Sequence, residues 1–190
     1  DVLDIGGEST RPGYTKLSDQ EEIDRVAPII EAVKARFDVP VSLDTYKSAV
    51  AEAGLKAGAD LINDIWGLKY DEKMGPVIAK YGLPCCLMHN REKSDYRMLI
   101  PDICADLEES LAIAEDAGID PDQIILDPGI GFGKTYEQNL AVIHHLEELN
   151  RFDLPILLGT SRKSVIGLTL DLPAEERMEG TLVTTVLAGE

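Results

Sequence analysis

Short apolar runs recur along this chain, each followed by a polar or glycine-containing tip and then by an amphipathic stretch, and this rhythm most constrains the fold. The runs are nearly continuous rather than alternating, which is typical of strands buried on both faces of a parallel sheet. They lie at 2–5, 39–43, 60–62, 83–88, 123–126 and 154–158. About six β–α units in a row favour an α/β fold, a TIM (β/α)₈ barrel, and a doubly wound sheet is the alternative.

The amphipathic stretches have helical spacing. Residues 21–37 repeat apolar side chains along one stripe, and Ser18 with Glu21 predicts a capping box at the start of this helix. Gly58 and Gly118 follow two further stretches, and glycine commonly ends a helix. Beyond the first, we predict helices over 48–57, 102–117, 136–150 and 175–188.

Length bounds the architecture. The 190 residues are 44% hydrophobic, which suits one partial barrel domain spanning 1–190. A TIM barrel typically takes ~250 residues, so we expect an incomplete barrel that lacks its first and last strands. Because an open barrel exposes sheet edges, we expect these residues alone to be poorly stable and inactive.

Composition excludes several classes of partner. With 18 Lys and Arg against 35 Asp and Glu, the net charge of -17 argues against nucleic acid, which clustered cations bind. No apolar run approaches the ~18 residues that predict a membrane span. Cys85, Cys86 and Cys104 lack the spacing of a zinc site or a disulfide framework, so a reducing cytoplasm fits best.

Polar residues follow the predicted strands, where both candidate folds place their active sites. Asp44, Asn63, Asp127 and Lys163 follow four separate strands, and we expect them to converge. Two carboxylates, an amide and an ammonium suit a flat heterocycle with a donor-rich edge and a carbonyl group. For a single Asp after a strand, the alternative is a helix N-cap.

The glycine-rich segment 129–135 does not match a nucleotide site. Pro128 stands where a phosphate-binding loop needs its first glycine, and Lys134 stands where the dinucleotide fingerprint needs its third. A loop that brings backbone and Phe132 close to a ligand fits these residues better.

Two segments are candidates for binding an anion. Residues 159–164 offer hydroxyl groups, backbone N–H groups and two cations at a predicted helix start, and helix capping by Ser161 or Ser164 is the alternative. Arg11 lies in a loop rich in glycine and proline, and a solvated surface arginine is the alternative there. His89 ends a strand and could face the site, but it has no neighbouring metal-ligand spacing.

The strand tips together resemble one family. Residues 4–13, Asp-Ile-Gly-Gly-Glu-Ser-Thr-Arg-Pro-Gly, and 127–134, Asp-Pro-Gly-Ile-Gly-Phe-Gly-Lys, resemble the dihydropteroate synthase signatures. Further blocks, in the family's order, lie at 42–47, 62–65, 88–90 and 161–164. The resemblance implies a TIM-barrel transferase of folate biosynthesis and a target of sulfonamides. Such an enzyme displaces diphosphate from 6-hydroxymethyl-7,8-dihydropterin diphosphate with the amine of p-aminobenzoate.

The resemblance also implies roles for particular residues. Thr10, Arg11 and Pro12 would lie on a mobile loop that closes over the second substrate, and Ser164 would lie near the p-aminobenzoate carboxylate. Mg²⁺ is the implied cofactor, with its main protein ligand expected on the absent first strand, and the complete protein is expected to be a homodimer. The pterin would be held by Asp44, Asn63, Asp127 and Lys163, with Met88 and Phe132 lining its pocket.

Two other functions are compatible with part of this pattern. A methyltetrahydrofolate-binding corrinoid methyltransferase could share the pterin-facing Asp and Asn positions, but it is not expected to carry residues 9–13 or 161–164 as they stand here. A catalytically inactive homologue kept as a binding module is the alternative from a different class. A turnover assay separates it from the enzyme.

Overall fold

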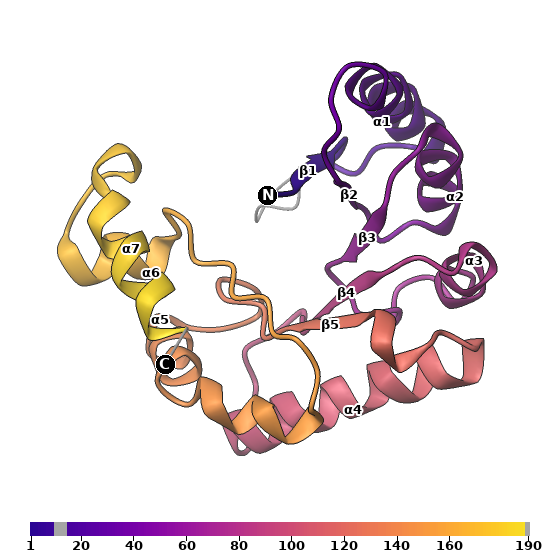
Figure 1. The fold of residues 1–190 in the computed structure, drawn as a ribbon. Coiled ribbons are helices and arrows are strands. Elements are labelled where there is room, and N and C mark those ends of the chain that lie inside the picture. Colours follow the sequence, from indigo (N-terminus) through magenta and orange to yellow (C-terminus); the bar gives the residue numbers. More distant parts are fainter. Residues whose placement is uncertain (10–14, 189–190) are drawn as a thin grey trace.

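The computed structural model of this chain describes residues 1–9 and 15–188. Within them, five parallel strands form one sheet whose spatial order is the chain order, with helices along its outer side (Figure 1). A doubly wound sheet reverses its strand order at a switch point, whereas a barrel adds each strand beside the previous one. The observed order therefore supports an open segment of a barrel. The strands are β1 (Leu3–Gly6), β2 (Val41–Asp44), β3 (Leu61–Asp64), β4 (Cys85–Met88) and β5 (Ile124–Asp127).

The register of the sheet aligns the polar tips. Asp44 pairs with Gly6 on one side and with Asn63 on the other, and Met88 pairs with Asp127. Asp44, Met88 and Asp127 end their strands and Asn63 lies one residue before the end of β3, so the ends of β2, β3, β4 and β5 form one continuous edge.

The sixth strand, predicted over 154–158, does not form over that whole length. It lies beside β5, where Leu126 N donates to Pro155 O at 2.9 Å and Leu157 N donates to Leu126 O at 2.8 Å. Only one parallel bridge, Leu126 to Ile156, results. Pro155 has no N–H to give to a ladder, and no described strand pairs with the other edge of this segment.

The helices confirm most of the predicted elements. Ser18 caps the first helix, since its hydroxyl accepts from Glu21 N and the Glu21 carboxylate accepts from Ser18 N at 3.0 Å, which is the predicted capping box. The second helix has the predicted bounds, and Gly58 ends it with a φ of 108°. The helices are α1 (Asp19–Lys34), α2 (Ser48–Ala57), α3 (Met74–Tyr81), α4 (Leu99–Ala117), α5 (Tyr136–His144), α6 (Ser164–Leu170) and α7 (Met178–Leu187).

Two predicted helices are shortened or divided in the structure, and one helix was not predicted. The helix predicted over 136–150 is wrong beyond His144, where η2 (Leu146–Phe152) continues as a 3-10 helix. The helix predicted over 175–188 is divided between η3 (Ala174–Glu176) and α7. Helix α3 was not predicted. A short 3-10 turn, η1 (Pro121–Gln123), precedes β5.

The core lies between the sheet and the helices outside it. Leu43, Leu87 and Leu126 from three strands are fully buried, and Ile30 of α1 and Leu107 of α4 pack over this layer. Cys85, Cys86 and Cys104 are buried free thiols, as expected of small apolar side chains. In the described part of the chain, no helix is long and apolar enough to cross a membrane.

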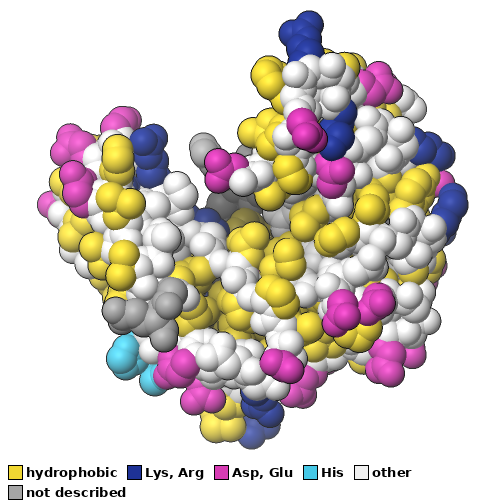
Figure 2. Space-filling model, viewed as in Figure 1, with side chains coloured by type: hydrophobic (Ala, Val, Ile, Leu, Met, Phe, Trp, Pro, Cys, Tyr) yellow, Lys and Arg dark blue, Asp and Glu magenta, His cyan; other side chains and the backbone are white. Residues whose placement is uncertain are grey.

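Helix α7 differs from the others because none of its residues is buried. It lies with α6 at one end of the open sheet, across from α1 and α2 (Figure 1). Figure 2 shows a hollowed face between these two parts, with many hydrophobic side chains along its wall. The exposed apolar side chains of α7 are Met178, Leu182, Val183, Val186 and Leu187.

Candidate active site

Four predicted residues form what we call the strand-end cluster: Asp44, Asn63, Asp127 and Lys163. Asp44 and Asp127 end β2 and β5, Asn63 is the second-to-last residue of β3, and Lys163 is the residue that precedes α6. Lys163 Nζ donates to the carbonyl oxygen of Ile130 at 2.5 Å, and its charge attracts both Asp127 and Asp44. The structure therefore brings the predicted carboxylates and ammonium group together, with Asn63 paired beside Asp44.

Asp44 has an unusual environment. Its Oδ1 is the one buried side-chain oxygen or nitrogen in the described part of the chain that lacks a hydrogen-bond partner. Burial raises the pKa of Asp44 to about 7, the nearby carboxylates of Asp4, Glu22 and Asp64 add to this, and Lys163 opposes it. At neutral pH this carboxyl group is thus divided between its two protonation states.

Asp127 is held by its own turn. Its Oδ1 accepts from Gly129 N at 2.7 Å, and this bond fixes the plane of the carboxylate. Gly129 has a φ of 69°, and a Cβ there would lie 2.0 Å from the carbonyl oxygen of His89, so only glycine fits. Burial raises the pKa of Asp127 to about 6, against the bond from Gly129 and the charges of Lys163 and Lys134. Asp127 is therefore mostly ionised at neutral pH.

Lys163 reaches the cluster from the loop before α6. Burial lowers the pKa of its ammonium group, while Asp127 and Asp44 oppose that shift. The ammonium lies 4.7 Å from the centroid of the Phe132 ring. Gly131 has a φ of 85°, a left-handed conformation that favours glycine, and it lies against the stem of Lys163.

An apolar layer lies beside the strand-end cluster. Tyr46, Ile65 and Met88 form a small buried group of their own, and Trp66 and Phe132 pack against it. The structure thus brings Met88 and Phe132 together, as the resemblance implied. A flat ring could rest on this layer while its edge met the polar groups.

Of the remaining predicted site residues, the structure describes only Ser164. Thr10, Arg11 and Pro12 lie outside the described residues. Ser164 is the exposed first residue of α6, directly after Lys163. The alternative that Ser161 or Ser164 caps this helix is wrong, because Lys163 is the N-cap and no side chain makes the capping bond.

The sequence analysis did not predict a buried ion-pair group that lies beside β1. Lys47 Nζ lies 2.8 Å from Glu8 Oε2 and 2.7 Å from Glu22 Oε2. It also donates to Leu17 O at 3.0 Å, while Leu17 N donates to Glu8 at 2.6 Å and the Tyr46 hydroxyl donates to the same carboxylate. Glu8 and Leu17 lie near the two ends of the connection from β1 to α1, so this group ties those ends together. Glu8 and Lys47 lie in the sequence blocks that resemble the family. That position was the only sequence feature that could have pointed to this group.

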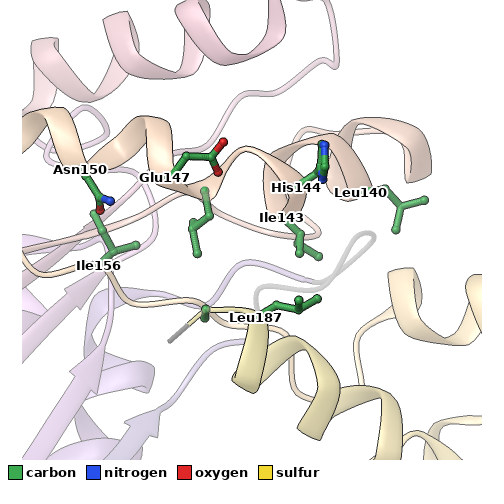
Figure 3. A pocket seen from close by; sticks show the side chains of 9 residues that line it. Leu140, Ile143, His144, Glu147, Asn150, Ile156 and Leu187 are labelled. Atoms are coloured by element: carbon green, nitrogen blue, oxygen red, sulfur yellow. The ribbon is translucent and has the colours of Figure 1, made fainter. Parts of the chain in front are cut away.

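A sizeable cavity lies elsewhere. It has a volume of about 480 Å³ and lies between α5, η2 and the end of α7 (Figure 3). A neighbouring apolar groove of about 340 Å³ is lined by α5, α6 and α7. None of the predicted site residues lines either one, so we place the candidate active site at the strand ends. The cavity in Figure 3 is lined by Leu140, Ile143, His144, Leu146, Glu147, Asn150, Ile156, Leu187 and Ala188.

The described residues do not form a set of metal ligands by themselves. They contain no group of three or more His, Cys, Asp or Glu side chains arranged to hold an ion. The two carboxylates of the strand-end cluster are instead matched by the ammonium group of Lys163. We therefore derive no chemical step through a metal ion.

Comparison with known proteins agrees with this geometry. The family described as pterin binding enzyme matches residues 1–190. Dihydropteroate synthase of Clostridium beijerinckii is 62% identical over 187 residues, which are 98% of this chain and 70% of the relative. A crystal structure of dihydropteroate synthase from Clostridium difficile, in the presence of pteroic acid, superposes with a TM-score of 0.96 at 47% identity, over 98% of this chain and 72% of that one. The Xanthomonas albilineans enzyme with 4-aminobenzoic acid gives 0.94 at 39% identity, over 99% and 69%.

Proposed function

This chain belongs to the pterin binding enzyme family, and from that membership we propose that it carries the pterin-binding part of a dihydropteroate synthase. The reaction joins 6-hydroxymethyl-7,8-dihydropterin diphosphate to p-aminobenzoate and yields 7,8-dihydropteroate and diphosphate. The solved relatives named with pteroic acid and with 4-aminobenzoic acid support this choice of substrates.

The unpartnered oxygen of Asp44 carries the proposal. A buried acceptor without a donor costs about 1–3 kcal/mol, and a ligand N–H that reaches it removes that cost. Asp127 presents a second carboxylate from β5, with its plane fixed by Gly129. Acceptors on two strands match a heterocycle with several N–H groups on its edge, which a pterin has.

Each member of the strand-end cluster has a separate role in the proposal. The ionised Asp127 accepts two hydrogen bonds from the amino-pyrimidine edge of the pterin. Lys163 donates to the ring carbonyl and a ring nitrogen, and Asp44 and Asn63 bind the remaining polar groups of the ring. Met88 and Phe132 contact its flat face.

These residues also suit the chemistry of the step. The bond between the exocyclic carbon and the diphosphate oxygen breaks, and the bonding electrons leave with the diphosphate. The lone pair of the p-aminobenzoate amine forms the new C–N bond, and that nitrogen then loses a proton. Positive charge that develops on the pterin is stabilised by the carboxylates of Asp44 and Asp127, whose burial raises their pKa values. No covalent bond to the enzyme is needed.

Several parts of the proposal depend on the resemblance alone. We keep Ser164 as the residue near the p-aminobenzoate carboxylate, and the loop with Thr10, Arg11 and Pro12 as the cover of that substrate. Mg²⁺ with a ligand outside these residues, a homodimer and a cytoplasmic location stay predictions. The role as a sulfonamide target has further support, because a solved Yersinia pestis relative is named with a sulfonamide drug complex.

The test uses a chimera in which these residues replace the matching segment of the Clostridium beijerinckii relative, which supplies the rest of the polypeptide. Diphosphate release is measured with the pterin diphosphate in the presence and absence of p-aminobenzoate. We expect turnover that depends on p-aminobenzoate and falls by more than about a hundredfold in Lys163→Ala, since a charge-assisted contact to the substrate is lost. Lys80→Ala, which removes an exposed ammonium group, is the matched control. Tight pterin binding without turnover would favour the inactive homologue instead.

A further inference from the structure

A chain of hydrogen bonds runs behind the strand-end cluster, from α4 to the loop after β5. Arg91 donates to both oxygens of Asp106, from Nε at 2.6 Å and from a terminal nitrogen at 3.1 Å. Asp106 Oδ2 lies 2.9 Å from His89 Nε2, and Lys134 Nζ lies 2.9 Å from His89 Nδ1. The imidazole is buried and both of its ring nitrogens have partners within this chain, so His89 has no free nitrogen to offer a ligand.

The direction of these hydrogen bonds follows from the chemistry of lysine. Burial lowers the pKa of Lys134 to about 7, so below that pH the side chain is an ammonium group, which only donates. His89 Nδ1 then accepts from Lys134, and the ring proton is on Nε2, where it is donated to Asp106. Burial lowers the pKa of His89 to about 3, with the charge of Lys134 adding to the shift against Asp106. The imidazole is therefore neutral, as this arrangement requires.

Lys134 uses its other two N–H groups on the loop itself. It donates to the carbonyl oxygens of Gly129 and Phe132, each at 3.0 Å. The three acceptors match the three donors of an ammonium group, and none of the three is a carboxylate. Lys134 thus bridges both ends of the turn over 129–132 and fixes that turn to β4 through His89.

This turn carries the backbone and aromatic contacts of the strand-end cluster. The carbonyl oxygen of Ile130 accepts from Lys163, and the ring of Phe132 lies under the same ammonium group. Lys163 and Lys134 both act on the charge of Asp127. A substitution at Lys134 would therefore affect the strand-end cluster in two ways. It would change the conformation of the turn, and it would remove a positive charge that acts on Asp127.

We propose that Lys134, fixed by His89 and Asp106, is a positioning residue for pterin binding: it sets the turn over 129–132 and keeps Asp127 in its ionised form. The inference rests on the proposed function, since it assumes that the strand-end cluster binds a pterin. Lys134 itself touches no substrate in this proposal.

The pH dependence has a defined sign. The charged groups that act on Asp127 are Lys163 and Lys134, and the buried thiol of Cys86 on the adjacent strand is kept neutral by a raised pKa. Burial lowers the pKa of Lys134 to about 7, so its charge acts on Asp127 below that pH. Both cations hold the pKa of Asp127 below the value that burial alone would give. Removing Lys134 then raises it above about 6, so the acid limb of a binding profile that needs ionised Asp127 moves to higher pH.

The experiment measures the affinity of the chimera for pteroic acid by calorimetry between about pH 5 and 8. Lys134→Met removes charge and donors, and Lys134→Gln keeps donors without the charge. We expect Lys134→Met to bind roughly tenfold to a hundredfold more weakly, and both variants to move the acid limb upward by about half a pH unit or more. Lys134→Gln should lose less affinity than Lys134→Met. Lys80→Met, an exposed lysine paired with Glu52, is the control and should keep the parent profile.

A further variant and the parent chimera distinguish a folding defect from a loss of binding. Asp106→Asn leaves Lys134 in place but weakens the far end of the chain, and it should reproduce a smaller part of the loss; it carries the test if Lys134→Met fails to fold. Parent-like affinity and pH profile in every variant that folds would overturn the inference. A parent chimera that binds no pteroic acid would instead refute the proposed function.

Discussion

Replacing Lys47 by methionine tests how much the buried ion-pair group beside β1 contributes to stability. Lys47 lies between two carboxylates, and the side chains of Glu8 and Glu22 are each only 2% exposed. Methionine has a similar length but leaves both carboxylates without a cation. Breaking a buried pair by removing one partner costs about 3–5 kcal/mol, because a charge is left buried and uncompensated.

The chain offers a control with the same geometry at the surface. Lys80 and Glu52 also lie 2.8 Å apart, but Lys80 is 63% exposed. Exposed pairs contribute about 0–1 kcal/mol, so Lys80→Met should change stability by no more than that. The measurement is urea denaturation of the chimera and both variants at pH 7, with the free energy of unfolding obtained from the transition midpoint and slope.

The pH dependence of this difference gives a second check. In the parent, hydrogen bonds from Lys47, Tyr46 and Leu17 hold the pKa of Glu8 below its usual 4.5 in spite of burial. The stability that Glu8 contributes is thus present above pH 4.5 and lost as the pH falls through its lower folded value. Without Lys47, burial dominates, so the variant should recover stability relative to the parent as carboxylates become protonated. A loss at pH 7 below about 1 kcal/mol, equal to that of the Lys80 control, would refute the reasoning.

Three further outcomes are expected. Asp127→Asn should weaken pteroic acid binding by more than about a hundredfold in calorimetry, since the amide replaces one acceptor by a donor; an affinity within threefold of the parent would contradict the assigned role. Gly129→Ala should lower the free energy of unfolding by about 2–4 kcal/mol, because the new Cβ would lie 2.0 Å from the carbonyl oxygen of His89. A Cβ at Gly82 would meet no atom within 4 Å, so the control Gly82→Ala should cost only the ~1 kcal/mol of left-handed strain. Pterin affinity should rise as the pH passes about 7 while Asp44 ionises, and Asp44→Asn should flatten that limb; an unchanged limb would show that another group titrates.

The strand ends could be predicted from the sequence because two signals coincide there. Continuous apolar runs mark buried parallel strands, and Asp44, Asn63 and Asp127 follow such runs directly. Parallel strands place equivalent ends at one edge, so the convergence needed no knowledge of side-chain packing. The family resemblance then added Met88 and Phe132, which the structure places together.

Helix α3 could not be predicted from local rules. Gly75 and Pro76 stand in its first turn, where both residues appear to break a helix. Proline is tolerated in a first turn, and a Cβ at Gly75 would lie 2.8 Å from that of Ala117 in α4. Close packing between α3 and α4 thus explains the glycine, and such packing is visible only in three dimensions.

The hydrogen-bond chain behind the strand-end cluster was hidden for a related reason. Asp106 and His89 are 17 residues apart, and Lys134 is 45 residues from His89. Local sequence shows Asp106 as one acidic residue on an amphipathic helix and Lys134 as the end of a glycine-rich segment. Only the fold brings them onto the same imidazole.

The strict agreement between chain order and strand order has a consequence for synthesis on the ribosome. Each strand from β2 to β5 pairs with the strand made just before it, so a newly emerged strand finds its partner already present. Paired residues such as Ser42 and Leu61 are also close in sequence, which keeps the loop that must close short. The sheet can therefore grow in one direction as the polypeptide leaves the exit tunnel, one β–α unit at a time, without waiting for a distant segment.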